Sequence, residues 1–546
     1  MVATAQDGAD AQSMRPSRPV PHTVEDLVGL TGARLVPAAS GTAAPVTGVA
    51  LNSREVQAGD LYAALPGAHL HGARFAADAA ASGAAAVLTD PEGAREVAGA
   101  GVDLPVLVSP EPRSWVGPVA AALYDSHPGD GTGQDLFAVT GTNGKTTTTY
   151  FTTSILRALG HTTGLIGTIE ILAGDTPIPS RLTTPEAPHV HSLLALMRER
   201  GITATAMEVS SHALEFHRVD GVHYDVAGFT NLTQDHLDLH GSMAEYFEAK
   251  AQLFTRERTR RAVVVLSPDE PWSGAMAQRA RENLGASAVT TVALRGSDTS
   301  AAEAADWTLR SLTRQGIGNS FVLQHADGRV LRVHTGLPGD FNVANAALAV
   351  LMVLDSGVAL DRLQAALDEH DPLTASVPGR MELVGTEPTS LVDFAHNPDA
   401  LVRALRSVDP REDDGRVIVV FGATGERDTT KRPVMGRVAA EEADVVIVTD
   451  DDPHREDPGP IREQVAQGAR EAVANGARAA EVLVIAPRAT AIRTAVRMAR
   501  PADSIVVAGR GHETAQDVNG VDIPLDDRVE LRDALAEMHM QTKEQK

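Results

Sequence analysis

One segment constrains the fold of this chain more than any other: a short apolar run, a glycine-bounded turn and a threonine-rich continuation at residues 136–148 (Leu-Phe-Ala-Val-Thr-Gly-Thr-Asn-Gly-Lys-Thr-Thr-Thr). The pattern is typical of a buried strand that ends in a phosphate-binding loop and leads into a helix. Gly141 and Gly144 let the backbone turn tightly and bring its N–H groups close to phosphate oxygens. Lys145 has the reach for β- and γ-phosphates, the Thr146 hydroxyl is a ligand for Mg²⁺, and the helix N-terminus adds a positive dipole end. The segment therefore predicts a nucleotide site, although Val139 stands where the longer form of this motif has glycine.

The composition excludes several classes of protein. A net charge of −24 over 546 residues argues against a nucleic-acid partner, because phosphate contacts need a basic face. The chain has no cysteine, which removes disulfides, thiolate catalysis and cysteine-bound zinc. The first residues lack an apolar signal-peptide core, and no run approaches roughly 18 uninterrupted apolar residues. We therefore expect a cytoplasmic protein without a membrane partner.

The chain is long enough for about three to four domains. We expect a disordered tail at residues 1–22 and domains at 23–130, 131–375 and 376–546, with a glycine-rich linker, Asp-Gly-Thr-Gly-Gln, at 130–134. Strands alternate with helices, such as the helix expected from about residue 148 to 159, which predicts an α/β fold with a parallel central sheet. In the last unit, apolar strands run into polar or glycine-rich turns. This pattern is typical of a Rossmann-like sheet, whose ligands gather at the carboxyl ends of the strands.

Several polar residues allow both a functional and a simpler explanation. Glu208 and His236 follow apolar runs and are candidate ligands for Mg²⁺, although the segment around His236 also fits a capped helix start. Lys250 lies on an amphipathic helix expected at 244–254, where a solvated or snorkelling lysine is the simpler explanation. Asn345 fits either a ligand contact or a helix cap. Ser53 and its neighbouring loops fit ordinary turn chemistry.

Taken together, the motifs resemble the Mur ligase family, in the type that adds an amino acid to UDP-N-acetylmuramoyl-L-alanyl-D-glutamate (the MurE type). The resemblance spans about residues 48–528, and its motifs follow the family order at 140–147, 183–185, 207–212, 231–238, 392–400, 421–436, 449–458 and 509–513. It implies an N-terminal UDP-binding domain, a central ATPase domain and a C-terminal Rossmann-like domain that binds the amino acid. It also implies a cytoplasmic, monomeric, ADP-forming ligase of peptidoglycan precursor synthesis that uses ATP and Mg²⁺.

The resemblance carries roles to individual positions. The ATP positions are Gly141, Thr142, Asn143, Gly144, Lys145, Thr146, Thr147, Asn345, Arg380, Asp393 and His396. The uridine end of the UDP-muramoyl-dipeptide falls on Ser53, His71 and Gly72, and its dipeptide end on Thr183, Thr184, Ser211 and Arg218. The amino acid falls on Arg427, Asp451, Asp452, His454, Gly509 and Glu513. The metal positions are Thr146, Glu208 and His236, and Lys250 matches the lysine that family members carbamylate (N6-carboxylysine). Lys145, Lys250, His236 and Glu208 form the implied catalytic set.

One departure from the family bears on the amino acid that is added. Members that add meso-diaminopimelate carry Asp-Asn-Pro-Arg where this chain has Asp451, Asp452, Pro453 and His454. Histidine lacks the fork with which arginine grips a carboxylate, and the extra aspartate adds negative charge. An acidic pocket favours a distal ammonium, so we expect L-lysine, with L-ornithine next. The alternatives are meso-diaminopimelate, if Arg455 replaces the missing arginine, and a catalytically silent Mur-like scaffold.

Overall fold

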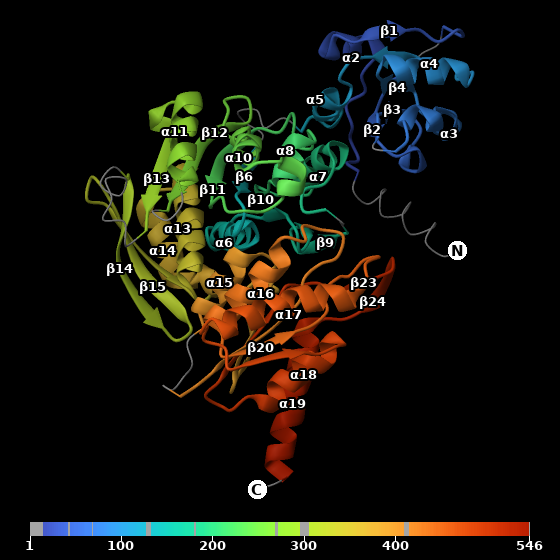
Figure 1. The fold of residues 1–546 in the computed structure, drawn as a ribbon. Coiled ribbons are helices and arrows are strands. Elements are labelled where there is room, and N and C mark those ends of the chain that lie inside the picture. The colour runs from blue at the N-terminus through green and yellow to red at the C-terminus, as the bar shows by residue number, and fades with distance from the viewer. Residues whose placement is uncertain are drawn as a thin grey trace.

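The computed structural model describes residues 15–41, 44–67, 69–126, 133–179, 182–267, 271–294, 305–408 and 414–544. The first fourteen residues of the expected tail and residues 130–132 of the expected linker lie outside these ranges. Sheets of five, eleven and six strands follow one another along the chain, which confirms the predicted α/β class. Figure 1 shows the N-terminal body in blue, the central body in green and yellow, and the C-terminal body in orange and red. The domain boundaries stay predictions.

The N-terminal sheet has the order β1-β5-β4-β3-β2, with β1 antiparallel and the others parallel. Local signals set its helices: the Asp90 side chain accepts a hydrogen bond from the Gly93 backbone at the start of α4, and Pro91 occupies its first turn. The elements are β1 (Arg34–Val36), β2 (Gly48–Ala50), β3 (Asp60–Ala64), β4 (Ala86–Thr89), β5 (Val106–Val108), α2 (Val24–Thr31), α3 (Ala76–Ala81), α4 (Pro91–Gly99) and α5 (Arg113–Tyr124).

The central sheet has the order β16-β15-β14-β13-β12-β11-β6-β10-β7-β8-β9. Its middle is parallel, as predicted, and both edges are antiparallel. The strands are β6 (Asp135–Thr140), β7 (Thr163–Ile166), β8 (Ile171–Ala173), β9 (Thr176–Ile178), β10 (Ala204–Glu208), β11 (Tyr224–Phe229), β12 (Thr259–Leu266), β13 (Val289–Ala293), β14 (Trp307–Gln315), β15 (Gly318–His325) and β16 (Val330–Thr335). The helices are α6 (Lys145–Ala158), α7 (Ala187–Glu199), α8 (Ser211–Glu215), α9 (Leu237–His240), α10 (Met243–Ala251), α11 (Trp272–Leu284), α13 (Asp340–Asp355) and α14 (Leu360–His370).

Helices cover both faces of strand β6, and the strand is buried between them. Phe137 and Val139 pack in one cluster with side chains of α6 and α13, while Leu136 and Ala138 pack in another with side chains of α7, α10 and α11. Successive side chains of a strand point to opposite faces, and here both faces are buried. The sequence of the strand is therefore apolar at consecutive positions. Helix α6 begins at Lys145, earlier than the sequence pattern indicated, because Gly144 at φ 90° ends the loop and begins the helix.

The C-terminal sheet has the order β17-β18-β22-β19-β20-β21, with β17 antiparallel and the other strands parallel. Helices cover both faces, as in a Rossmann-like domain. The strands are β17 (Glu382–Thr386), β18 (Thr389–Asp393), β19 (Val417–Phe421), β20 (Val445–Val448), β21 (Glu481–Val484) and β22 (Ser504–Ala508), with a separate hairpin of β23 (Ala515–Val518) and β24 (Val521–Pro524). The helices are α15 (Pro398–Arg406), α16 (Lys431–Glu442), α17 (Pro458–Ala474), α18 (Arg488–Met498) and α19 (Asp527–Glu544).

The central and C-terminal sheets direct loops at each other. In the central sheet, Glu208 at the end of β10 lies beside Val139 of β6, and in the C-terminal sheet Asp393 at the end of β18 lies beside Ala508 of β22. Carboxyl ends of parallel strands are where α/β proteins bind ligands, and here two such edges meet. Among the described residues, no helix is both long and apolar enough to cross a membrane.

Candidate active site

The phosphate loop joins β6 to α6 and depends on its two glycines. Gly141 has φ 145° and Gly144 has φ 90°, and a Cβ at these positions would clash with Thr230 Oγ1 and Asn345 Oδ1, respectively. The Lys145 Nζ donates hydrogen bonds to the carbonyl oxygens of Gly141 (3.0 Å) and Thr142 (2.8 Å). Burial lowers the pKa of Lys145, and the nearby carboxylates oppose that shift. The loop therefore holds its cation against its own backbone, in the geometry of a phosphate site.

Glu208 lies next to this loop, fully buried and held by hydroxyl and backbone groups. The Thr146 hydroxyl donates to one carboxylate oxygen (3.0 Å), and Thr168 donates to both oxygens through its backbone N–H (2.8 Å) and its hydroxyl (3.0 Å). The Thr184 hydroxyl donates to the Glu208 carbonyl (2.8 Å). A fixed carboxylate beside a phosphate-loop hydroxyl suits a hard divalent cation, which prefers oxygen ligands.

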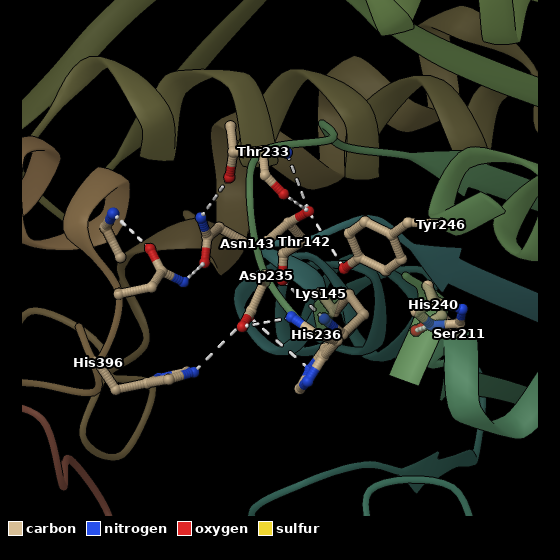
Figure 2. A network of polar contacts seen from close by, with 12 residues as sticks. Thr142, Asn143, Lys145, Ser211, Thr233, Asp235, His236, His240, Tyr246 and His396 are labelled. Carbon is tan, nitrogen blue, oxygen red and sulfur yellow. Dashed lines mark hydrogen bonds and ion pairs between the residues drawn. The ribbon is translucent and has the colours of Figure 1, made fainter. Parts of the chain in front are cut away.

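His236 lines the same cavity as this carboxylate, and Figure 2 shows it from close by among Asp235, His240 and Tyr246. Asp235 lies 3.7 Å from His236 Nε2 and 3.9 Å from His396 Nε2. Burial lowers the pKa of His236 to about 4, although Asp235 opposes this shift. His236 is therefore neutral near pH 7, and a neutral ring nitrogen is the form that binds a metal.

Lys250 is buried behind the phosphate loop, so the explanation as a solvated or snorkelling lysine is wrong. Its Nζ donates to the Gly141 carbonyl (2.8 Å) and lies 4.5 Å from the centre of the Tyr246 ring. Burial, reinforced by the charge of Lys145, lowers the pKa of Lys250 well below its usual range. A buried amine of lowered pKa is a nucleophile, because its uncharged form carries a lone pair.

The central and C-terminal domains make direct polar contacts at the phosphate loop. The Asn143 side chain donates to Asp399 Oδ2 (3.1 Å) and accepts a hydrogen bond from the Asn397 amide (3.2 Å). The Arg380 guanidinium donates to Thr146 Oγ1 (3.4 Å) and lies 4.3 Å from the Phe394 ring. The C-terminal domain thus contacts the phosphate loop itself.

A second group of charges lies at the C-terminal side of the same cavity. Arg510 is fully buried, forms an ion pair with Asp452, and lies 3.9 Å from Asp451 and 3.6 Å from Glu513. Burial, reinforced by Asp451, raises the pKa of Glu513 to about 8. The pairing corrects our expectation that Asp452 supplies free negative charge, because its carboxylate is engaged by Arg510. Asp451 and Glu513 also lie within ion-pair distance of this guanidinium, so the three carboxyl groups share one buried cation.

A cavity of about 640 Å³ between the central and C-terminal domains brings most of the expected site residues together. It is lined by Thr142, Asn143, Gly144, Lys145, Thr146, Thr147, Thr183, Thr184, Glu208, Arg218, His236, Asn345, Arg380, Asp393, His396, Arg427, Asp451, Asp452, His454, Gly509 and Glu513. Gly141, Ser211 and Lys250 do not line it. Gly141 is part of the phosphate loop, Lys250 lies behind it and donates to the Gly141 carbonyl, and the Ser211 hydroxyl is 3.1 Å from His240 Nε2. The assigned roles of all these residues stay predictions.

The residues expected at the uridine end lie in the N-terminal domain, outside this cavity. Ser53 begins a short 3₁₀ turn, and His71 caps another by accepting a hydrogen bond from the Ala73 backbone (3.0 Å). His71 Nε2 also lies 3.2 Å from Asp90. Gly72 packs so close to Leu65 that a side chain would displace backbone. These contacts account for the local turns and leave the uridine role a prediction.

Sequence reasoning missed several residues of the site. Thr168, which orients Glu208, lies in the short loop after β7, and Asp399, which contacts Asn143, follows the His396 motif. Arg510 falls between two expected residues, Gly509 and Glu513, and was passed over. An arginine flanked by glycines at the end of an apolar strand was the signal that pointed to it.

The fold and the site define a class: a three-domain α/β protein with a nucleotide-type site, in which a phosphate loop faces the strand ends of a Rossmann-like domain. Family comparison divides the chain in the same way. Residues 45–123 match the Mur ligase family catalytic domain, residues 139–353 the Mur ligase middle domain, and residues 379–511 the Mur ligase glutamate ligase domain.

Full-length relatives agree with the domain matches. The UDP-N-acetylmuramyl-tripeptide synthetase of Leifsonia xyli is 42% identical over 97% of this chain and 99% of its own length. The UDP-N-acetylmuramoyl-L-alanyl-D-glutamate–2,6-diaminopimelate ligase of Streptomyces coelicolor is 43% identical over 95% of this chain and 98% of its own. A solved structure of a ligase of that second name superposes with a TM-score of 0.62 at 31% identity, covering 91% of this chain and 96% of that one. This chain belongs to the Mur ligase family, in its MurE type, and is an ATP-dependent ligase that forms a peptide bond.

Proposed function

We propose that this ligase joins a diamino acid, L-lysine in preference to L-ornithine, to the D-glutamate γ-carboxylate of UDP-N-acetylmuramoyl-L-alanyl-D-glutamate. The name of the Streptomyces coelicolor relative supports a diamino acid and this UDP-linked acceptor. The observation that carries the choice of lysine is the acidic pocket around Asp451 and Glu513, in which Arg510 is the buried counter-charge. Peptidoglycan precursor synthesis, in the cytoplasm, is the setting that this reaction implies.

In the first step, the D-glutamate carboxylate attacks the γ-phosphorus of ATP, which forms an acyl phosphate and releases ADP. Lys145, on the phosphate loop, neutralises charge on the transferred phosphoryl group, the main catalytic contribution in phosphoryl transfer. Thr183, Thr184 and Arg218 line the cavity on the side of Glu208 and are the residues we assign to the dipeptide. Placing both reactants in one cavity supplies much of the acceleration.

In the second step, the uncharged α-amine of the amino acid attacks the acyl carbon, a C–N bond forms, and inorganic phosphate leaves. The amine loses one proton as the amide forms. The amino-acid residues Arg427, Asp451 and Glu513 line the same cavity as Lys145, so the two steps share one cavity. Asn345, Arg380, Asp393 and His396 are the residues we assign to the nucleotide.

Residues beside the phosphate loop fit a divalent cation. Thr146 and Glu208 present oxygen within one hydrogen-bonded group, and His236 presents a neutral nitrogen. These are the residues that would hold Mg²⁺, which supplies positive charge against the phosphate oxygens when bound.

Lys250 fits a carbamate for a reason visible in its surroundings. The uncharged form of its buried amine, which the lowered pKa favours, can attack the carbon of CO₂, forming an N–C bond and losing one proton, so that a neutral amine becomes an anion. The anion would lie beside the Gly141 carbonyl and the loop, where it is able to support the charge of a metal.

The alternative of meso-diaminopimelate requires a cation for a distal carboxylate. The candidate for this role, Arg455, is exposed and is not among the residues that line the cavity. His454, which does line it, has no bidentate fork. These observations support lysine, although several relatives bear diaminopimelate in their names. A silent scaffold is disfavoured, because Lys145, Glu208 and Lys250 are all in place.

The test is phosphate release from ATP in the presence of the UDP-linked dipeptide and one amino acid at a time. We expect turnover with L-lysine, weaker turnover with L-ornithine and little with meso-diaminopimelate. Lysine and ornithine differ by one methylene, which is worth only about 1–3 kcal/mol, so some ornithine turnover is part of the expectation. Turnover with meso-diaminopimelate and an inert lysine would contradict our account of the pocket, and no turnover with any of them would favour the scaffold.

A further inference from the structure

The hairpin β23–β24 is attached edge-on to the loop that carries Asp451, Asp452 and His454. The His454 backbone N–H donates to the Asp517 carbonyl (3.2 Å), and its carbonyl accepts from the Asn519 N–H (2.7 Å), so the loop pairs with the hairpin like a short third strand. The Asp517 N–H also donates to Asp452 Oδ1 (3.1 Å). The hairpin therefore supports, from outside the cavity, the loop whose residues Asp451, Asp452 and His454 line its amino-acid end.

Asp517 also contacts the His454 side chain directly. The His454 Nδ1 lies 2.8 Å from Asp517 Oδ2. An ionised carboxylate only accepts hydrogen bonds, so this contact places a proton on Nδ1. In the neutral ring, the remaining nitrogen, Nε2, then carries the lone pair and is a hydrogen-bond acceptor. The contact in turn lowers the pKa of Asp517, which keeps that carboxylate ionised.

At this end of the cavity, acceptor groups lie beside the buried cation of Arg510, and the exposed Arg427 also lines the cavity. Asp451 and Glu513 face Arg510, which is also bonded to Asp452 and to the Ala515 carbonyl of the hairpin. Arg510 thus joins the acidic group to the hairpin. A ligand group with several N–H donors and a positive charge is complementary to the carboxyl groups of Asp451 and Glu513, whereas a distal carboxylate is not.

We propose that Asp517 is a specificity-determining positioning residue: it fixes the proton of His454 on Nδ1, so that His454 Nε2 accepts a hydrogen bond from the distal ammonium of the amino acid. This proposal rests on the proposed function and adds to it a residue that does not line the cavity. Histidine in place of the family arginine is then a donor-to-acceptor exchange, which converts a site for a carboxylate into a site for an ammonium.

The experiment compares L-lysine with L-norleucine, an amino acid of similar length that ends in a methyl group. The lysine-to-norleucine ratio of kcat/KM, measured by phosphate release, isolates recognition of the distal ammonium from recognition of the α-amino acid. We expect Asp517→Asn to lower this ratio about tenfold, on the order of the loss of one hydrogen bond to a charged group, with norleucine turnover unchanged. Asp517→Ala should act in the same direction, which guards against an effect peculiar to the amide.

Asp522→Asn is the matched control. Asp522 lies directly opposite Asp517 on the other strand of the hairpin and is exposed, so the variant removes the same charge from the same element. We expect it to leave the ratio unchanged. A second check is His454→Gln, whose amide oxygen is an acceptor that needs no partner to fix a tautomer. In that background, Asp517→Asn should have no further effect on the ratio, as a double-mutant cycle would record.

The outcomes separate this inference from the proposed function. A wild-type ligase that uses lysine, together with an unchanged ratio in Asp517→Asn, overturns the inference alone. Equal losses with lysine and norleucine also overturn it, because they would show that Asp517 only supports the hairpin. A wild-type ligase that uses meso-diaminopimelate and ignores lysine overturns both.

Discussion

Glu513 makes the choice of lysine dependent on pH. Its pKa is raised to about 8 by burial, reinforced by Asp451, and Arg510 opposes the shift. The group is therefore mostly uncharged at pH 7, and it ionises as the pH rises through 8. With that pKa, about one-tenth of the protein carries an ionised Glu513 at pH 7 and about nine-tenths at pH 9. The distal ammonium of lysine, with an ordinary pKa of about 10.4, stays charged over this range.

The lysine-to-norleucine ratio of kcat/KM should therefore rise with pH, by about tenfold between pH 7 and pH 9 if only the form with ionised Glu513 holds the ammonium well. The assay is phosphate release at each pH with saturating ATP and UDP-linked dipeptide. The ratio cancels the titration of the α-amine, which both amino acids share. In Glu513→Gln the rise should vanish. A ratio that is flat in the wild type, or that rises equally in Glu513→Gln, would refute the assignment of Glu513 to the distal ammonium.

Three further perturbations test the site and its support. Gly144→Ala should abolish ATP-dependent turnover without unfolding the protein, because a Cβ at φ 90° meets Asn345 Oδ1; nucleotide-binding calorimetry and a thermal melt measure the two effects. Lys250→Arg should lose the ¹³C carbamate signal that ¹³CO₂ is expected to give in the wild type, because guanidinium stays protonated; the same signal in the variant would place the carbamate elsewhere. Arg488 and Asp527 form a fully buried ion pair, and Arg488→Met leaves the Asp527 charge buried without its partner. The variant should destabilise the C-terminal domain by about 3–5 kcal/mol, as measured by urea unfolding. A loss of unfolding free energy below about 1 kcal/mol would contradict this expectation.

The sequence was sufficient to predict the features that local patterns encode. The phosphate loop needs glycine, lysine and threonine at fixed spacing, and the buried strands of a parallel sheet are apolar on both faces. The fold class and the placing of Lys145 and Glu208 at strand ends followed from these patterns. The family assignment rested on motifs spread over the chain, most of which lie at such an end.

Contacts between distant residues were beyond the sequence patterns. Asp452 and Arg510 are 58 positions apart, and His454 and Asp517 are 63 apart, so no spacing rule connects them. From the number of charges alone, we expected Asp452 to be a free anion, whereas in the structure its carboxylate is paired with Arg510. Lys250 was misjudged for a related reason: its helix is amphipathic, but the phosphate loop covers its polar end.

The most direct test of the central claim is a competition. The ligase is incubated with ATP, UDP-N-acetylmuramoyl-L-alanyl-D-glutamate and an equimolar mixture of L-lysine, L-ornithine and meso-diaminopimelate, and the UDP-linked product is identified by mass spectrometry. The account predicts a product with the mass of the lysine adduct and a minor ornithine adduct. A product dominated by the diaminopimelate adduct would contradict it.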